Sequence, residues 1–207
     1  MQSNWDEIAK EHADFECSLF DVDEARAFIS ENYNSDVVLA FDTLKPYSYK
    51  SDLFRFCYLC INGGIYIDIK YKLVDQFRFS ELIDAEYLTH EPLGTQTCLM
   101  VLLEKSQLMS ECIDEIVQFA LEKKRAKTPL FTGPALLSKM HLKLCKNRPM
   151  NADLVWSVEN GLQIIRKNGN VILQQYDEYR KDLTVIDNPQ PHYTKMFWNN
   201  EEYNSTV

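Results

Sequence analysis

The stretch from Ser51 to Tyr71, SDLFRFCYLCINGGIYIDIKY, shows a helical hydrophobic period before a glycine pair and a different period after it. The apolar residues before the glycines recur at helical spacing; they are Leu53, Phe56, Cys57, Cys60 and Ile61. Ser51 stands where its hydroxyl can cap the N-terminus of this helix. Gly63-Gly64 is typical of a C-terminal stop. The pattern predicts a helix between Ser51 and the glycine pair.

After the glycine pair the hydrophobic period falls to two. Isoleucine occupies every second position from Ile65 to Ile69, which places these side chains on one face of a strand. The opposite face then carries Tyr66, Asp68 and Lys70. We therefore expect a buried strand that presents polar groups at its end.

Upstream, local signals predict two more helices. Asp21 and Glu24 have the spacing of a capping box, which predicts a helix from about 22 to 32. A helix is also expected over 36–44, ended by Pro46. The apolar stretch 15–20 is expected to form a short strand.

Downstream, strands and helices are predicted to alternate. The apolar run 98–103 is typical of a central strand, and an amphipathic helix follows over 106–124. Asn168-Gly169 between two apolar arms, within 164–173, predicts a hairpin. These elements indicate an α/β fold, and the absence of linkers or repeats predicts one domain over residues 1–207.

Composition excludes several classes of function. The chain has 207 residues with 31 acidic against 22 basic side chains, a formal charge of −9, so we expect no nucleic-acid partner. No apolar run approaches the ~20 residues needed to cross a bilayer, and no secretory signal is visible. We expect a cytoplasmic protein without a transmembrane segment, whose six scattered cysteines are reduced.

One longer motif resembles a known family. Ser51-Asp52-Leu53-x-Arg55, then seven residues, then Gly63-Gly64-Ile65-Tyr66-x-Asp68 is similar to the DXD-motif glycosyltransferases of glycosyltransferase family 32. That family includes initiating mannosyltransferases and capsular-polysaccharide enzymes. The resemblance extends over about 15–200, with supporting pieces at Thr132-Gly133-Pro134, His192-Tyr193 and Trp198.

The resemblance implies a fold and a reaction. The fold would be GT-A-like, a mixed sheet flanked by helices. Members of the family usually open with a strand that contacts the donor nucleotide, and residue 1 of this sequence lies near the helix that follows that strand, so the strand is either absent or outside the given sequence. The reaction would move a hexose from a UDP- or GDP-linked sugar to a glycan or glycoconjugate acceptor, with retention of configuration, as in polysaccharide biosynthesis. The resemblance supplies no agreed nucleophile, so no catalytic base is named.

Donor-binding residues follow from the motif and from simple chemistry. An Asp and an Arg one helical turn apart share a helix face and can hold sugar hydroxyls or phosphate. A glycine allows the backbone to approach the ligand closely. The expected donor-binding residues are Asp52, Arg55, Gly64, Tyr66, Asp68 and Lys70.

A divalent cation is the usual partner of the diphosphate, and the resemblance implies Mn²⁺ or Mg²⁺. The expected ligands are Asp68 and, as a second one, His192. However, Lys70 stands where the motif has its second acid, and a protonated lysine cannot be a ligand. Three outcomes stay open: a metal held by Asp68 and His192, a transferase that needs no metal, or an inactive one.

Two other classes compete with a transferase. Asp68-Ile69-Lys70 also fits the D-x-K half of a Mg²⁺-dependent nuclease signature, although Asp52, the required upstream acid, lies on a predicted helix. A non-catalytic relic that binds a nucleotide sugar is the other alternative. Asp52 and Arg55 also have a purely structural interpretation, as a helix-dipole contact and its ion-pair partner.

Overall fold

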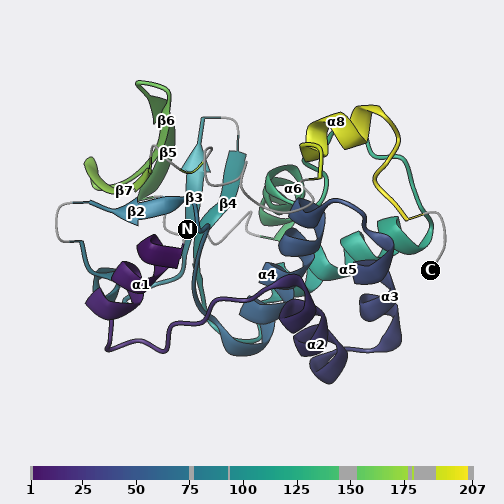
Figure 1. The fold of residues 1–207 in the computed structure, drawn as a ribbon, viewed down its shortest axis with the longest axis horizontal. Coiled ribbons are helices and arrows are strands. Elements are labelled where there is room, and N and C mark those ends of the chain that lie inside the picture. The colour runs from purple at the N-terminus through teal and green to yellow at the C-terminus, as the bar shows by residue number, and fades with distance from the viewer. Residues whose placement is uncertain are drawn as a thin grey trace. The chain divides into compact units, whose positions relative to one another are not determined.

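The chain divides into two compact units, drawn in Figure 1. The structure is a computed structural model that describes residues 2–74, 77–92, 94–144, 153–176, 179 and 190–204. The sheet unit consists of Met1–Leu19, Ile65–Leu102 and Arg148–Pro189. The helical unit consists of Phe20–Gly64, Leu103–Asn147 and Gln190–Val207. That they form one glycosyltransferase domain stays a prediction.

The sheet unit contains a seven-stranded sheet with the order β1-β4-β3-β5-β6-β7-β2. The strands are β1 (Gly64–Ile67), β2 (Tyr71–Leu73), β3 (Tyr87–Glu91), β4 (Gly94–Leu102), β5 (Leu154–Glu159), β6 (Leu162–Lys167) and β7 (Asn170–Gln175). β3 pairs with β5 in parallel, whereas β3–β4, β5–β6, β6–β7 and β2–β7 are antiparallel. The expected mixed sheet is confirmed, while its GT-A-like character stays a prediction.

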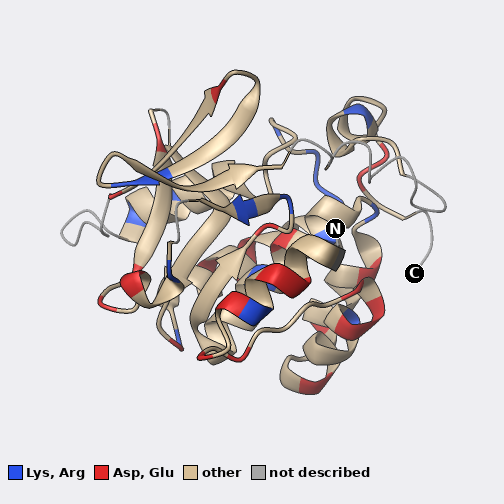
Figure 2. Ribbon diagram, turned by 60° about the vertical axis from the view of Figure 1, so that its left-hand side comes forward, with Lys and Arg blue, Asp and Glu red and all other residues tan. Residues whose placement is uncertain are grey.

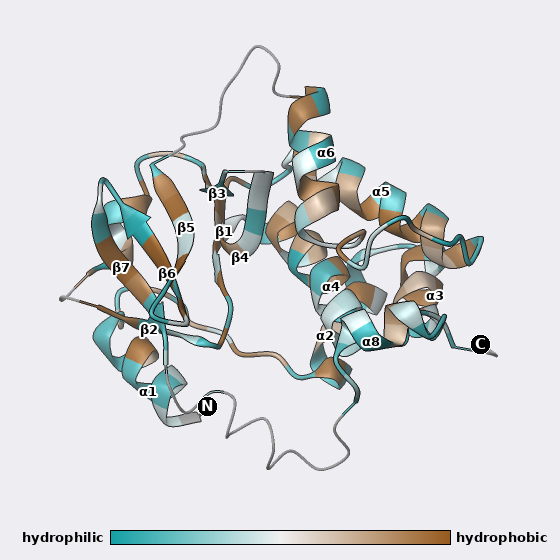
Figure 3. Cartoon of the chain, turned by 90° about the horizontal axis from the view of Figure 1, so that it is seen from above, coloured by the Kyte–Doolittle hydropathy of each residue, from teal (hydrophilic) through white to brown (hydrophobic). Residues whose placement is uncertain are grey.

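One hydrophobic core lies on the sheet of this unit. It includes Tyr71 of β2, Leu99 of β4 and Ile165 of β6, all fully buried, and Ile8 of α1 (Gln2–Glu11). A 3-10 helix, η1 (Phe79–Leu82), adds Phe79. Figure 3 shows the hydrophobic positions of β5, β6 and β7 in brown. The strands of this sheet bury neighbouring as well as alternate side chains, most extensively in β4, which is buried at six consecutive positions.

The hairpin of this unit forms as its sequence predicts. β6 and β7 pair from Lys167↔Asn170, and the two residues between them are Asn168 at φ 51° and Gly169 at φ 84°. Both have the positive φ that a type I′ turn requires, which Asn-Gly adopts at low cost.

The helical unit contains six described helices. They are α2 (Val22–Asn32), α3 (Ser35–Thr43), α4 (Tyr47–Asn62), α5 (Gln107–Leu121), α6 (Pro134–Leu144) and α8 (Tyr193–Trp198). Their inner faces meet in a core that includes Phe41, Phe56, Met109 and Leu137. Acidic residues of these helices are marked red in Figure 2, and two on α5 pair with lysines of α6. Every helix in the described part of the chain is too short or too polar to cross a bilayer.

Several local predictions are confirmed. α2 has the predicted bounds, and its capping box joins the Asp21 carboxylate to the Glu24 N–H at 2.8 Å. α3 lies within one residue, and α5 within three residues, of the expected ends. The cysteines at 17, 57, 60, 98 and 112 are free thiols, and Cys145 lies outside the described residues.

Three local predictions are wrong in part. Residues 15–20 form no strand, because Phe20 packs its ring on Phe54 and Tyr58 instead of joining a ladder. α4 begins at Tyr47, four residues before Ser51, because the Gln190 side chain accepts the Tyr47 N–H at 3.0 Å. Ser51 is therefore no cap.

The strand after the glycine pair is shorter than expected. β1 ends at Ile67 and is an edge strand, half-buried, because β4 is its neighbour on one side and nothing in the described sheet pairs with the other. The Tyr71 N–H donates to the Asp68 carbonyl at 3.1 Å, which closes a β-turn over 68–71. Lys70 thus lies in a turn.

Candidate functional site

The Asp52 cluster lies in the helical unit and consists of Ser51, Asp52, Arg55 and Thr132. The Asp52 Oδ1 atom is 3.3 Å from Arg55 Nη2, and Oδ2 accepts the Thr132 hydroxyl at 2.7 Å. Arg55 also donates to the Ser51 carbonyl at 3.2 Å and to its hydroxyl at 3.0 Å. The Asp52 and Arg55 side chains are only 12% and 7% exposed, so this is a buried ion pair.

The backbone of the segment before α6 is fitted closely around the Asp52 carboxylate. A Cβ atom added to Gly133 would lie 2.7 Å from Asp52 Oδ2, closer than real Cβ contacts. Thr132, fully buried, precedes this glycine, and Pro134 begins α6. The Thr132-Gly133-Pro134 segment therefore holds Asp52, in addition to starting a helix as its sequence indicates.

The structural interpretation of this pair is only partly supported. Asp52 is the sixth residue of α4, beyond the first turn where the helix dipole acts. The ion pair with Arg55 is confirmed. Burying two charges costs several kcal/mol each before their attraction is counted, so a pair of this kind is weak evidence of a stabilising role.

Tyr49, one turn before Asp52, is a residue that the sequence analysis missed. Its side chain is buried and its hydroxyl has no hydrogen-bond partner within the described ranges. Burial, together with the charge of Glu202 and the nearby Tyr193, raises the pKa of the Tyr49 phenol. Only its helical spacing from Asp52 could have indicated it.

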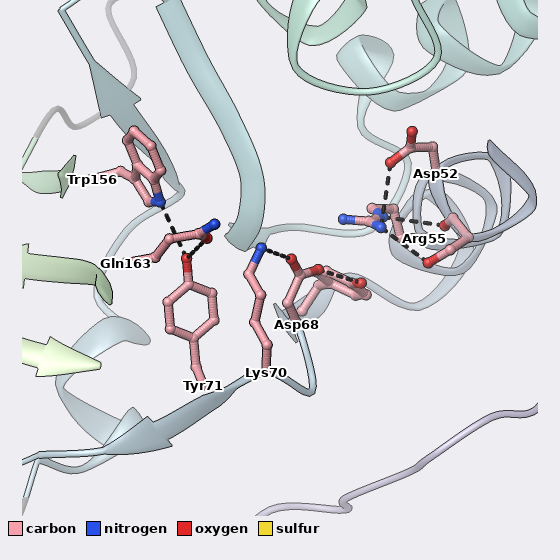
Figure 4. A network of polar contacts seen from close by, with 9 residues as sticks. Asp52, Arg55, Asp68, Lys70, Tyr71, Trp156 and Gln163 are labelled. Carbon is pink, nitrogen blue, oxygen red and sulfur yellow. Dashed lines mark hydrogen bonds and ion pairs between the residues drawn. The ribbon is translucent and has the colours of Figure 1, made fainter. Parts of the chain in front are cut away.

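The Asp68 cluster lies in the sheet unit and consists of Tyr66, Asp68 and Lys70. The Tyr66 hydroxyl donates to Asp68 Oδ1 at 2.8 Å, and Lys70 Nζ lies 3.0 Å from Asp68 Oδ2 (Figure 4). The Asp68 N–H donates to the Cys98 carbonyl at 2.9 Å, which anchors the residue beside β4. Both oxygens of the carboxylate are thus engaged.

An aromatic ring that is itself held by two further side chains lies beside Lys70. Its Nζ lies 5.3 Å from the centre of the Tyr71 ring, within cation–π range. The Tyr71 hydroxyl in turn donates to Gln163 Oε1 at 3.1 Å and accepts the Trp156 indole N–H at 3.2 Å, as Figure 4 shows. These partners come from β5 and β6, and no local pattern could have predicted them.

The ammonium form of Lys70 is favoured in this setting. Burial acts to lower the pKa of Lys70, but the charge of Asp68 and its hydrogen bond outweigh burial and raise it. Tyr179 also faces this pair: burial and Asp68 raise the pKa of its phenol, while Lys70 lowers it. The cluster therefore presents a cation fixed beside a carboxylate.

Gly64 and His192 have backbone or capping roles in the structure. Gly64 has φ +96° with nothing within 4 Å of an added Cβ, and it follows Gly63, the C-cap of α4, at φ 62°. His192 is exposed and caps α8, with Nδ1 2.8 Å from the Thr194 hydroxyl. His192 belongs to the helical unit and Asp68 to the sheet unit.

The N-terminal part of the chain matches one protein-family model. Residues 1–91 match the family model described as "Glycosyltransferase sugar-binding region containing DXD motif". This match supports a glycosyltransferase. It contains six of the predicted site residues, and His192 lies outside it. The finer assignment to glycosyltransferase family 32 stays a prediction.

The likeness to a solved structure is distant. A solved structure titled "PaToxG Glycosyltransferase" aligns with 57% of this chain and 38% of its own length, at 17% identity and a TM-score of 0.39. The chain therefore spans well under half of that structure's length. None of the curated proteins matches this sequence.

Glycosyltransferase domains with a DXD motif generally bind a divalent metal, so we tested whether Asp68 and its neighbours fit one. Such a cation takes several oxygen ligands, and carboxylates supply most of them. Here the cluster has one carboxylate, with a phenol on Oδ1 and an ammonium 3.0 Å from Oδ2. No group of three or more His, Cys, Asp or Glu residues that could hold a metal occurs among the described residues. This donor set does not fit a divalent cation.

Proposed function

We propose that the chain transfers a hexose from a UDP- or GDP-linked sugar to a hydroxyl group of a glycan or glycoconjugate acceptor, with retention of configuration. The observation that carries the proposal is that the Asp52–Arg55 and Asp68–Lys70 ion pairs both lie in the segment that matches a glycosyltransferase sugar-binding region. The buried Asp52–Arg55 pair, in particular, is expensive for a purely structural contact.

Each cluster offers groups that can bind part of a nucleotide sugar. We propose that Asp52 and Arg55 bind hydroxyl groups of the donor sugar, because a carboxylate and a guanidinium form strong charge-assisted hydrogen bonds. Lys70 would contact the diphosphate and Tyr66 and Gly64 the neighbouring atoms of the donor.

The test is donor binding and donor hydrolysis by the purified chain. UDP-glucose and GDP-mannose serve as probes, and thermal shift and release of UDP or GDP are the readouts. A donor at 100 times its Kd stabilises the native state by ~2.7 kcal/mol, which gives a measurable rise in melting temperature. We expect at least one probe to bind and to be hydrolysed slowly with water as acceptor.

A matched pair of variants identifies the site. Asp68→Asn keeps the Tyr66 hydrogen bond but removes the charge, and we expect it to abolish turnover while the chain still folds, as circular dichroism would show. Asp84→Asn is the control, because Asp84 of the same unit also accepts a tyrosine hydroxyl, that of Tyr87 at 2.7 Å. Equal hydrolysis by wild type and Asp68→Asn would remove Asp68 from the mechanism.

The competing classes give different results in the same assays. A nucleotide-sugar-binding relic would show the thermal shift without hydrolysis. A D-x-K nuclease would cut plasmid DNA with Mg²⁺ and ignore both donors. Either outcome would overturn the proposed function.

A further inference from the structure

We propose that Lys70 takes the place of the divalent cation, so that the chain binds the donor diphosphate and transfers the sugar without a metal. This inference rests on the proposed function and specifies how the same site handles the charge of the leaving group. It concerns an ammonium group that the geometry holds beside the single acid of the motif.

The first step of the argument is the engagement of Asp68. Its Oδ1 atom accepts the Tyr66 hydroxyl at 2.8 Å, and its Oδ2 atom is 3.0 Å from Lys70 Nζ. A cation bound at Oδ2 would lie next to a positive charge at that distance, and the repulsion between them would weaken its binding. Asp68 is therefore a positioning residue for Lys70.

The second step is the capacity of the ammonium. Lysine has three N–H donors, and among the described residues the charged partner of Lys70 Nζ is Asp68. The remaining donors are available to oxygens of a diphosphate. The side chain is 21% exposed, so the group is held in place yet still accessible.

The third step is that Lys70 is fixed before the donor binds. The turn over 68–71 sets its backbone, the Tyr176 N–H donates to its carbonyl at 3.2 Å, and the Tyr71 ring lies 5.3 Å from Nζ. Tyr71 is itself held by Gln163 and Trp156. A charge fixed in advance stabilises developing negative charge without reorganisation during the reaction.

The chemistry balances without a metal. The bond between the anomeric carbon and the diphosphate oxygen breaks, and its electron pair stays on that oxygen. A new bond forms from the anomeric carbon to the acceptor oxygen, whose proton is released to solvent. Lys70 remains protonated throughout and stabilises the charge on the departing diphosphate by hydrogen bonds.

The experiment compares donor binding and hydrolysis in EDTA with the same measurements in Mn²⁺. UDP, GDP, UDP-glucose and GDP-mannose are the probes, and isothermal titration supplies a readout independent of turnover. We expect wild-type affinity and rate to change less than about threefold between the two conditions. Lys70→Met should weaken binding of the diphosphates in EDTA at least ~10-fold and slow hydrolysis ~100-fold.

Two further variants sharpen the test. Lys167→Met is the matched control, since Lys167 Nζ also lies 5.3 Å from a tyrosine ring, that of Tyr87, and we expect it to leave binding unchanged. Lys70→Asp creates a second acid, and we expect it to lose activity in EDTA, to recover part of it in Mn²⁺, and to bind Mn²⁺ in an electron paramagnetic resonance titration that shows no site in wild type.

The outcomes separate this inference from the proposed function. If EDTA abolishes wild-type hydrolysis and Mn²⁺ restores it, the chain is a metal-dependent transferase and the inference is wrong while the function stands. Unchanged diphosphate affinity in Lys70→Met would also overturn it. If no probe binds under either condition, both the function and the inference fail.

Discussion

The buried ion pair of α4 gives the sharpest test of how the Asp52 cluster is built. Asp52→Ala removes the carboxylate that accepts from Thr132 at 2.7 Å and faces Arg55 at 3.3 Å, so a guanidinium that is 7% exposed loses this ion pair. Breaking one side of a buried pair typically costs about 3–5 kcal/mol. We expect a loss of stability in that range.

Replacing both charges should cost much less. The double variant Asp52→Ala/Arg55→Met removes both charges of this pair, so we expect it to lie within about 2 kcal/mol of wild type. The non-additivity of the cycle then measures the interaction between the two side chains. Lys45→Met is the control, because the Lys45–Glu201 pair of the same unit is about 40% exposed on each side and should contribute at most about 0.5 kcal/mol.

The assay is urea unfolding followed by circular dichroism at 222 nm, which reports mainly on the helices. Comparing midpoints at constant slope gives the change in unfolding free energy. Additive single variants, or an Asp52→Ala loss no larger than that of Lys45→Met, would refute the conclusion that this pair is buried and coupled. Donor hydrolysis by the folded double variant then shows whether the pair binds substrate.

Three further predictions concern other residues. Burial and the charge of Arg78 lower the pKa of His12 in the folded chain, so the unfolded chain binds more protons below pH ~6.5. The melting temperature of the wild type should therefore fall between pH ~6.5 and pH ~5. It should fall less steeply in His12→Leu, which has no imidazole at this position. Gly133→Ala should lower the stability by about 1–3 kcal/mol in urea unfolding, because its Cβ would lie 2.7 Å from the Asp52 carboxylate. Burial raises the pKa of the Cys57 thiol, so peptide mapping should find this residue unalkylated by iodoacetamide in native protein and alkylated in urea.

Elements encoded by neighbouring residues could be predicted from the sequence. The Asp21–Glu24 capping box and the Asn168-Gly169 turn each depend on contacts within a few residues, and both form as expected. The i,i+3 pair of Asp52 and Arg55 is local in the same sense. Where one helical turn or one hairpin turn decides the geometry, the pattern alone is sufficient.

Features that depend on distant residues could not be predicted. α4 begins early because Gln190, far along the chain, accepts its first N–H. Thr132 closes on Asp52 from the segment before α6, and Trp156 and Gln163 fix Tyr71 from β5 and β6. Each of these contacts forms only in the tertiary fold, and the spacing of residues within the motif does not predict it.

The turn at the end of β1 explains why the residue at position 70 determines whether the site needs a divalent cation. In a continuous strand, residues 68 and 70 would be two positions apart along an extended chain, about 6.6 Å between Cα atoms. The turn over 68–71 instead folds the chain back, and Lys70 Nζ reaches Asp68 Oδ2 at 3.0 Å. Two carboxylates in these positions would repel each other unless a cation lay between them. Lys70 supplies that positive charge from the chain itself. The Lys70→Asp variant should therefore need a bound divalent cation, such as Mn²⁺, in place of the lysine ammonium.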